Sequence, residues 1–184
     1  TRAYDLGCSL GASTLQLRRH LPDDCHVVGV DNSEAMVSRC TANLSRDHSA
    51  ASYEILLEDL RETTIENASI VILNFTLQFV PDEERKNILA HICEGLKVGG
   101  ILLLAEKVKF EDASEQALMT SLHHDFKKQH GYSDLEISQK RAALENVLIP
   151  NTEAQHKQRM HDAGFSVVEQ CMRCLNFSTI LGIK

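Results

Sequence analysis

Short apolar runs alternate along this chain with longer segments that mix apolar and polar residues. The runs are rich in valine, isoleucine and leucine, and residues 69–73 form a nearly continuous one. Such runs are typical of strands that are buried on both faces of a parallel sheet. We predict a strand ending at residue 6, further strands at 27–31, 53–57, 69–73 and 101–105, and helices at 13–20, 34–45 and 82–96.

The pattern changes in the last third of the chain. Residues 110–150 are polar, charged and helix-prone, and we interpret them as a helical insertion beside a site. A helix at 152–163 follows, with Gly164 just past its C-terminus. Residues 165–174 and 176–183 are predicted to form a closing hairpin with at least one antiparallel strand. Gly99 and Gly100 are expected to end the helix before residue 101.

Strands that alternate with helices at these lengths predict an α/β, Rossmann-like fold. We expect a mostly parallel, seven-stranded sheet with helices on both faces. The length of 184 residues suits a single domain over residues 1–184. Because residue 1 leads directly into a strand, we expect the native protein to extend further upstream.

Composition and charge narrow the functional classes. The net charge is −7 and no stripe of lysine and arginine is present, so direct nucleic-acid binding is not expected. The six cysteines lack the spacing of a disulfide framework, and we interpret them as reduced thiols of a cytoplasmic protein. No apolar run approaches the ~18 residues of a membrane span, so no membrane association is expected.

A glycine-containing loop follows the first strand. Gly7 and Gly11 lack a Cβ, which lets backbone N–H groups and a helix N-terminus approach a ligand closely. Asp31 ends the second strand, where a carboxylate can accept hydrogen bonds from ribose hydroxyls. The dinucleotide fingerprint is absent, because Ser9 stands between the two glycines. The loop therefore predicts a nucleoside site and resembles the first motif of class I S-adenosylmethionine-dependent methyltransferases.

Polar side chains also mark the ends of other predicted strands. They are Asp5, Asp31, Asp59 and Asn74, one for each of the first four strands. Ligands bind at the carboxyl ends of parallel strands in open α/β sheets. These four residues are therefore expected to gather around one site.

Five segments together resemble the carboxy-S-adenosyl-L-methionine synthases. They are residues 5–11, 30–33, 73–79, 123–127 and 131–141, and the resemblance runs from Tyr4 to the C-terminus. It implies a class I methyltransferase fold that turns S-adenosyl-L-methionine into its carboxylated form, using prephenate and releasing phenylpyruvate. The product would supply the carboxymethyl donor for wobble-uridine modification of tRNA by a second enzyme. The resemblance further implies a homodimer and an N-terminal segment, absent here, that helps close the site.

The resemblance also assigns roles to individual residues. Arg141 would be the catalytic residue, because a planar guanidinium can bind the added carboxylate with two hydrogen bonds. The remaining assignments concern the adenosyl ligand: Gly7, Cys8 and Ser9 beside the methionine part, Asp31 on the ribose, Asn32, Asp59 and Leu60 around the adenine, and Asn74 near the amino-acid end.

Several alternatives stay open from the sequence. An ordinary methyltransferase acting on a small molecule, or a non-enzymatic protein that binds the adenosyl ligand, would share the same loop. Arg141 could act within its own subunit or across an interface. Cys171 and Cys174 have zinc-ligand spacing but no second pair, so we interpret them as strand cysteines and expect no metal. The segment His123-His124-Asp125 could ligate a metal or relay protons, but adjacent residues point apart on a helix, which disfavours a metal site. Its place in the family motif allows a role in shaping the substrate site.

Overall fold

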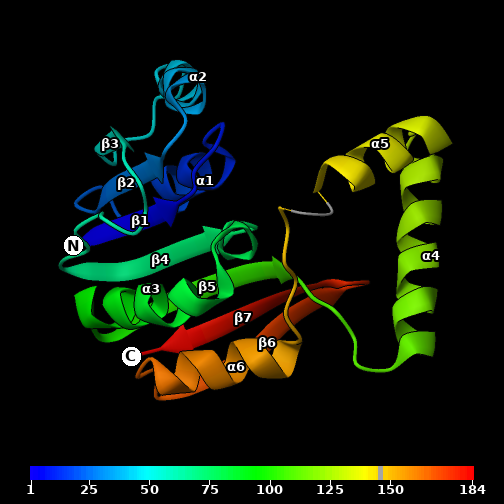
Figure 1. Ribbon diagram of the computed structural model, residues 1–184. Helices are drawn as coiled ribbons and strands as arrows, with labels where there is room; N and C mark the ends of the chain where they lie inside the picture. Colours follow the sequence, from blue (N-terminus) through cyan, green and yellow to red (C-terminus); the bar gives the residue numbers. More distant parts are fainter. Residues whose placement is uncertain (145–146) are drawn as a thin grey trace.

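A computed structural model describes residues 1–144 and 147–184 (Figure 1). One seven-stranded sheet has the strand order β3-β2-β1-β4-β5-β7-β6. Strands β1 to β5 are parallel, and β7 runs antiparallel to both of its neighbours. The strands are β1 (Arg2–Leu6), β2 (His26–Asp31), β3 (Tyr53–Leu57), β4 (Ala68–Asn74), β5 (Leu96–Lys107), β6 (Val167–Cys174) and β7 (Phe177–Ile183).

Helices cover both faces of the sheet, as the alternation of elements predicted. Tyr4 and Leu6 pack into the larger core with Leu89 of one helix, whereas Ala3 packs on the opposite face with Leu17 of another. The helices are α1 (Ala12–His20), α2 (Glu34–Leu44), α3 (Asp82–Gly95), α4 (Ala113–Gln129), α5 (Asp134–Leu144) and α6 (Glu153–Asp162), with a short 3₁₀ helix η1 (Leu77–Phe79). Successive residues of a strand point to opposite faces, so one strand serves both cores.

The predicted closing elements are confirmed. Thr152 and Gln155 form a reciprocal capping box at the start of α6, and Gly164 has a positive φ of 106° just after the helix. The hairpin of β6 and β7 follows, and β7 is the antiparallel neighbour of β5.

The predicted role of Gly99 and Gly100 is wrong. Helix α3 already ends at Gly95, and β5 begins at Leu96, so both glycines lie inside the strand. The pairing of β5 with β4 shifts register at this point, and Gly99 has a φ of +78°. A Cβ on Gly100 would lie only 3.1 Å from the carbonyl oxygen of Ala68. The glycines therefore accommodate an irregularity in the sheet rather than end a helix.

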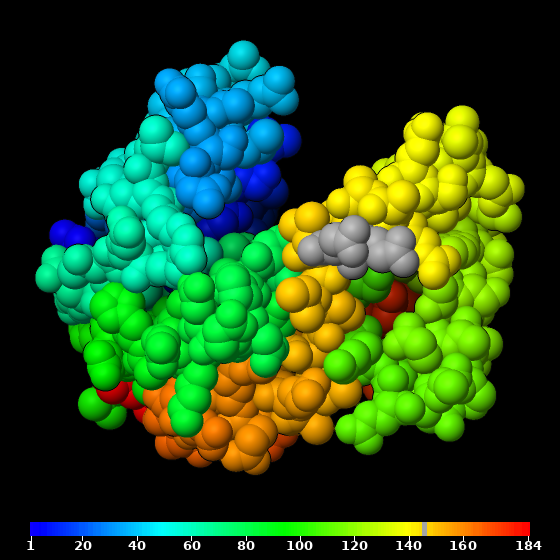
Figure 2. Space-filling view, in the orientation of Figure 1, coloured from blue at the N-terminus to red at the C-terminus, as the bar shows by residue number. Residues whose placement is uncertain are grey.

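Helices α4 and α5 stand away from the sheet, beyond the carboxyl ends of the parallel strands (Figure 1). No residue of α4 is buried, and Ile137 is the buried residue of α5. Figure 2 shows the surface hollowed between these helices, in green and yellow, and the blue N-terminal part of the chain. Both the glycine loop and the insertion therefore face the same end of the sheet.

Two buried ionisable side chains hold the segment that follows β4. Glu106 of β5 accepts hydrogen bonds from the backbone N–H groups of Leu77 (2.9 Å) and Gln78 (3.0 Å). Arg85 of α3 is fully buried and donates to the carbonyl oxygens of Val80 (2.9 Å) and Gln78 (3.2 Å). The same guanidinium bonds the segment that returns from the insertion, through the carbonyl of Ile149 (3.0 Å) and the side chain of Asn151.

The buried Glu106 gives a pH-dependent contribution to stability. Burial raises the pKa of Glu106 from 4.5 to about 8, although its backbone donors favour the ionised form. The unfolded chain therefore loses this proton at lower pH than the folded protein. The stabilisation is complete below pH 4.5 and is lost as the pH rises through about 8.

Replacing Glu106 by Gln, which resembles the protonated acid, should remove this pH dependence. The free energy of unfolding of the wild-type protein minus that of Glu106→Gln is expected to fall steadily from pH 5 to pH 8. Urea denaturation at several pH values measures both quantities, and groups common to the two proteins cancel in the difference. A difference that is independent of pH would mean that the pKa of Glu106 is unchanged by folding.

Candidate functional site

The glycine loop is built from backbone conformations that side chains disfavour. Gly7 and Gly11 have φ values of 81° and 84°, and Ser9 has 49°. A Cβ on Gly7 would collide with the side chain of Thr76, and one on Gly11 would lie 2.6 Å from the sulfur of Cys40. Both glycines are therefore required by the closeness of neighbouring elements as well as by the turn.

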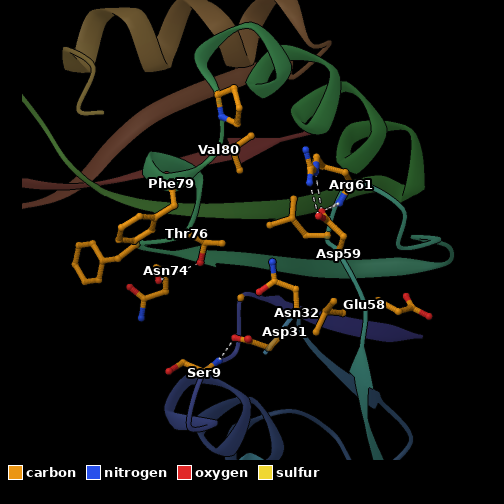
Figure 3. A pocket seen from close by; sticks show the side chains of 15 residues that line it. Ser9, Asp31, Asn32, Glu58, Asp59, Arg61, Asn74, Thr76, Phe79 and Val80 are labelled. Carbon is orange, nitrogen blue, oxygen red and sulfur yellow. Dashed lines mark hydrogen bonds and ion pairs between the residues drawn. The ribbon is translucent and has the colours of Figure 1, made fainter. Parts of the chain in front are cut away.

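Asp31 ties two loops together at the carboxyl end of β2. One carboxylate oxygen accepts from the backbone N–H of Ser9 (2.9 Å), and the other accepts from that of Ser33 (2.9 Å). Each oxygen has a second lone pair, so the carboxylate can accept further bonds. No side-chain hydrogen bond caps α2, and Asp31 accepts from the backbone N–H of the N-cap residue, Ser33. Figure 3 shows Asp31 and Ser9 joined at the edge of a cavity.

A cleft of about 540 Å³ opens at this end of the sheet, and we call it the strand-end cleft. Seven predicted residues line it: Gly7, Ser9, Asp31, Asn32, Asp59, Leu60 and Asn74. Further lining residues come from the loops after β3 and β4: Glu58, Arg61, Phe75, Thr76, Phe79, Val80 and Pro81 (Figure 3). The cleft thus combines residues from the ends of four parallel strands.

Cys8 does not line the strand-end cleft. Its side chain is buried beside Cys40, and its backbone N–H donates to the carbonyl of Val30 (2.9 Å). The hydrogen bond with the Cys40 thiol, followed by burial, raises the pKa of Cys8. Cys8 therefore supports the loop from behind and offers neither a thiolate nor a free N–H group. Gly7 likewise donates its backbone N–H to the carbonyl of Val30 (2.8 Å). It lines the cleft with backbone atoms only.

Asp5 was predicted to lie at the site with Asp31, Asp59 and Asn74, but it does not line the cleft and has a structural role. It is 1% exposed and accepts a hydrogen bond of 2.6 Å from the hydroxyl of Thr14 in α1. Burial raises the pKa of Asp5 to about 6, while the bond from Thr14 acts in the opposite direction. Asp5 therefore fastens α1 to β1 beneath the glycine loop.

Asp59 lies in the cleft together with a residue that sequence reasoning missed. Arg61 donates to both oxygens of its carboxylate, at 2.9 and 2.5 Å, and also reaches Glu84 at 2.9 Å. These bonds hold the pKa of Asp59 below its usual range. The pair forms one wall of the cleft (Figure 3). The run Glu58-Asp59-Leu60-Arg61 after a strand was the available sequence signal.

Two aromatic side chains were also missed. Phe75 and Phe79 follow β4, line the cleft and are 41% and 44% exposed. Phe75 has a φ of 58°, a strained conformation for a bulky residue, and it accompanies the sharp turn after Asn74. The amide of Asn74 itself donates to the hydroxyl of Ser13 at 3.1 Å. Exposed phenylalanines in a cleft offer π faces to a ligand.

Arg141 lies in a different cavity. This second cavity, of about 270 Å³, is formed by the end of β5, helices α4 and α5, and the segment after them. Because four cationic side chains line it, we call it the cationic cavity. Its lining comprises Lys107, Gln116, Thr120, His123, His124, Lys127, Ile137, Lys140, Arg141, Leu144, Leu148, Pro150 and Asn176. The structure therefore does not bring Arg141 together with Asp31 within one chain.

The six cysteines divide between the core and strand β6. All six cysteines are free thiols, with Cys171 and Cys174 exposed on β6. Across residues 1–144 and 147–184 no group of three His, Cys, Asp or Glu side chains is placed to hold a metal ion. None of the described helices has the length and apolar character of a membrane span.

Comparison with solved structures supports the fold. An O-methyltransferase family 2 protein from Planctomyces limnophilus superposes with a TM-score of 0.72 at 15% identity, covering 100% of this chain and 49% of that one. A magnesium protoporphyrin IX methyltransferase from Synechocystis with bound SAH gives a TM-score of 0.69 at 17% identity, covering 99% of this chain and 73% of the other. Identities this low show the shared methyltransferase architecture alone.

Sequence comparison is more specific. Residues 3–100 match the family model described as a methyltransferase domain. A carboxy-S-adenosyl-L-methionine synthase of Shewanella sp. strain MR-7 is 52% identical over 185 residues, covering 100% of this chain and 76% of that protein. The protein of the same name from Shewanella oneidensis is 51% identical with the same coverage. With the methyltransferase fold and the strand-end cleft in place, these similarities show that the chain belongs to the carboxy-S-adenosyl-L-methionine synthase family of class I methyltransferases.

Proposed function

We propose that this protein converts S-adenosyl-L-methionine to carboxy-S-adenosyl-L-methionine with prephenate as the carboxyl donor. Binding of the adenosyl group is supported by the position of Asp31, which lies in the strand-end cleft and is hydrogen-bonded to the glycine loop. Its carboxylate retains acceptor capacity that two vicinal ribose hydroxyls can use. Family membership supports the carboxylated product, since the relatives carry that name.

The adenine is proposed to lie between Asn32 and the Asp59–Leu60 wall. Arg61 already binds both oxygens of Asp59, so an adenine amino group would share that carboxylate rather than occupy it alone. A carboxylate has about four lone-pair sites, which leaves room for this contact. Leu60 offers an apolar surface for the ring.

The methionine part is proposed to lie between the glycine loop and the loop after β4. Gly7 and Ser9 line the cleft on one side, and Asn74 lines it on the other. The sulfonium is a cation, and the exposed ring faces of Phe75 and Phe79 can stabilise such a charge. Cys8 contributes by packing behind the loop.

The proposed reaction balances as follows. Prephenate loses carbon dioxide and its ring hydroxide, and the ring becomes aromatic, giving phenylpyruvate. The hydroxide takes one proton from the sulfonium methyl group and leaves as water. The resulting methylene carbon forms a bond to the carbon dioxide, which gives the carboxylated sulfonium. A second enzyme would use this product on the wobble uridine of tRNA.

A homodimer is proposed from an exposed apolar surface on the insertion. Leu118, Leu122 and Phe126 recur every four residues on α4, and each is more than two-fifths exposed. This spacing places all three on one face of the helix. Leu135 of α5 is also exposed. A second copy of the chain that covers this face would also bring its own α5, and with it Arg141, close to the interface.

The reaction can be tested with purified components. The protein is expected to convert S-adenosyl-L-methionine and prephenate into equal amounts of phenylpyruvate and an adenosyl product heavier by one CO2 unit, detected by mass spectrometry. Without prephenate no product should form. Methyl transfer to a small molecule in the absence of prephenate would instead identify an ordinary methyltransferase, and the proposal would be wrong.

Arg141 is proposed to pair with the added carboxylate, either from its own chain or from a second copy. Arg141→Ala should weaken binding of the carboxylated product by about 2–5 kcal/mol, as when one partner of a buried charge pair is truncated. Arg141→Lys should also weaken it, because the planar fork is lost. Binding of S-adenosyl-L-methionine, which lacks this carboxylate, should change much less.

Titration calorimetry with both ligands measures these four affinities. Arg46→Ala, at an exposed residue of the loop after α2, is the control and should leave both ligands unaffected. Equal losses for the two ligands in Arg141→Ala would show that Arg141 has a structural role and does not recognise the carboxylate.

A further inference from the structure

The cationic cavity concentrates positive charge in a protein whose net charge is −7. Lys107 comes from the end of β5, Lys127 from α4, and Lys140 and Arg141 from α5. Among the described residues that line the cavity, none is an aspartate or a glutamate. None of these four cations forms an ion pair with another residue in the described ranges 1–144 and 147–184.

The cationic groups raise one another's electrostatic energy. Burial, with Lys127 and Arg141 nearby, lowers the pKa of Lys107. Burial and Lys140 lower the pKa of Lys127. Burial, with Lys127 and Lys107 nearby, lowers the pKa of His123 to about 4, so this imidazole is neutral at pH 7. A bound anion would relieve this repulsion, and several cations favour an anion of more than one charge.

A buried amide in the same cavity has an unused hydrogen-bonding atom. Asn176 is 2% exposed, and its side-chain oxygen finds no hydrogen-bond partner in the described part of the chain. An unsatisfied buried polar atom is costly, and it usually indicates a missing partner. The carboxamide oxygen could accept a hydrogen bond from a hydroxyl group. If the amide is rotated so that its oxygen and nitrogen exchange places, its NH2 group could donate to a carboxylate.

The remaining wall of the cavity is apolar. Ile137 and Leu144 of α5, with Leu148 and Pro150 after it, complete the lining. An inorganic ion would gain nothing from these side chains, whereas an organic anion would bury its carbon skeleton against them. The volume of about 270 Å³ suits a small organic molecule.

A short aromatic series joins this cavity to the strand-end cleft. His123 of the cationic cavity packs edge-to-face on Phe177, with ring centroids 5.0 Å apart. Phe177 in turn packs edge-to-face on Phe75 of the strand-end cleft, at 5.5 Å. Phe177 also directly follows Asn176. The two cavities are therefore neighbours, separated by one aromatic side chain.

We propose that the cationic cavity binds a small organic dicarboxylate, with Lys107 and Lys127 holding its carboxylates and Asn176 holding a polar group on its body. This inference rests on the proposed function in one respect: it identifies that dicarboxylate with the carboxyl donor. Bound there, the donor lies beside the aromatic series and next to the cleft that holds the adenosyl ligand.

The experiment uses two double variants with the same change in net charge. Lys107→Gln/Lys127→Gln removes two cations from the cavity. Lys97→Gln/Lys109→Gln removes two exposed lysines that lie outside the lining and form no ion pair within residues 1–144 and 147–184. Titration calorimetry measures the affinity of each protein for prephenate, for the monocarboxylate phenylpyruvate and for S-adenosyl-L-methionine. Product formation is followed separately by mass spectrometry.

The cavity variant is expected to bind prephenate about 10- to 100-fold more weakly, which corresponds to lost hydrogen bonds between charged groups. The affinity of the cavity variant for phenylpyruvate should fall less. Its affinity for S-adenosyl-L-methionine should stay within about twofold of that of the wild-type protein, which also verifies that the variant is folded. The control variant should retain prephenate affinity. Asn176→Leu, a single substitution at the buried amide, should also weaken the binding of prephenate.

Two results would overturn the inference: unchanged prephenate affinity in the cavity variant, or an equal loss in the control variant. If the wild-type protein forms the carboxylated product and the cavity variant keeps its KM for prephenate, the donor binds elsewhere while the proposed function stands. If prephenate affinity depends on Lys107 and Lys127 but no product forms, the dicarboxylate site stands and the proposed function fails.

Discussion

Two buried ionisable side chains, Arg85 and Glu106, set the geometry on which the rest of this structure depends. A buried polar side chain without water needs hydrogen-bond partners, and each of these finds them in the backbone of the segment after β4. That segment is one wall of the strand-end cleft. Arg85 also bonds Ile149 and Asn151, so the chain returning from the insertion is fastened to the same place. The positions of both cavities therefore follow from one hydrogen-bond network.

The two cavities have opposite electrostatic character. The strand-end cleft carries three carboxylates, those of Asp31, Glu58 and Asp59, against the single guanidinium of Arg61. The cationic cavity carries lysines and an arginine. A sulfonium cofactor suits the first environment, and an anionic carboxyl donor suits the second. Phe75 and Phe177, packed edge-to-face between them, mark where the two ligands of the proposed reaction would meet.

Elements with strong local patterns were predictable from the sequence. The apolar run at residues 69–73 and the alternation of strands with helices predicted a parallel sheet. The polar residues that end its strands predicted a shared site, and the sheet places Asp31, Asp59 and Asn74 around one cleft. The register shift near Gly99 was not predictable, because it depends on pairing between β4 and β5. Arg61 was not predicted as a site residue, because its place in the cleft depends on the hydrogen bonds that its guanidinium makes to Asp59.

Contacts between distant residues account for the larger differences. Cys8 lies in the glycine loop as expected, but the packing of Cys40 of α2 against it directs its side chain inward. Arg141 belongs to a motif whose sequence carries no information on which cavity it enters. Lys107 and Lys127 were not predicted as site residues, because two lysines twenty residues apart line one cavity only when α4 folds over the end of β5.

The strand-end cleft is proposed to hold an adenosyl sulfonium, and this protein to make its carboxylated form. Both proposals can be tested most directly by measuring the mass of the small molecule released from protein purified out of cells. An adenosyl ligand heavier than S-adenosyl-L-methionine by one CO2 unit is expected. Recovery of S-adenosyl-L-methionine alone from cells that contain prephenate would contradict the proposal that this protein makes the carboxylated form.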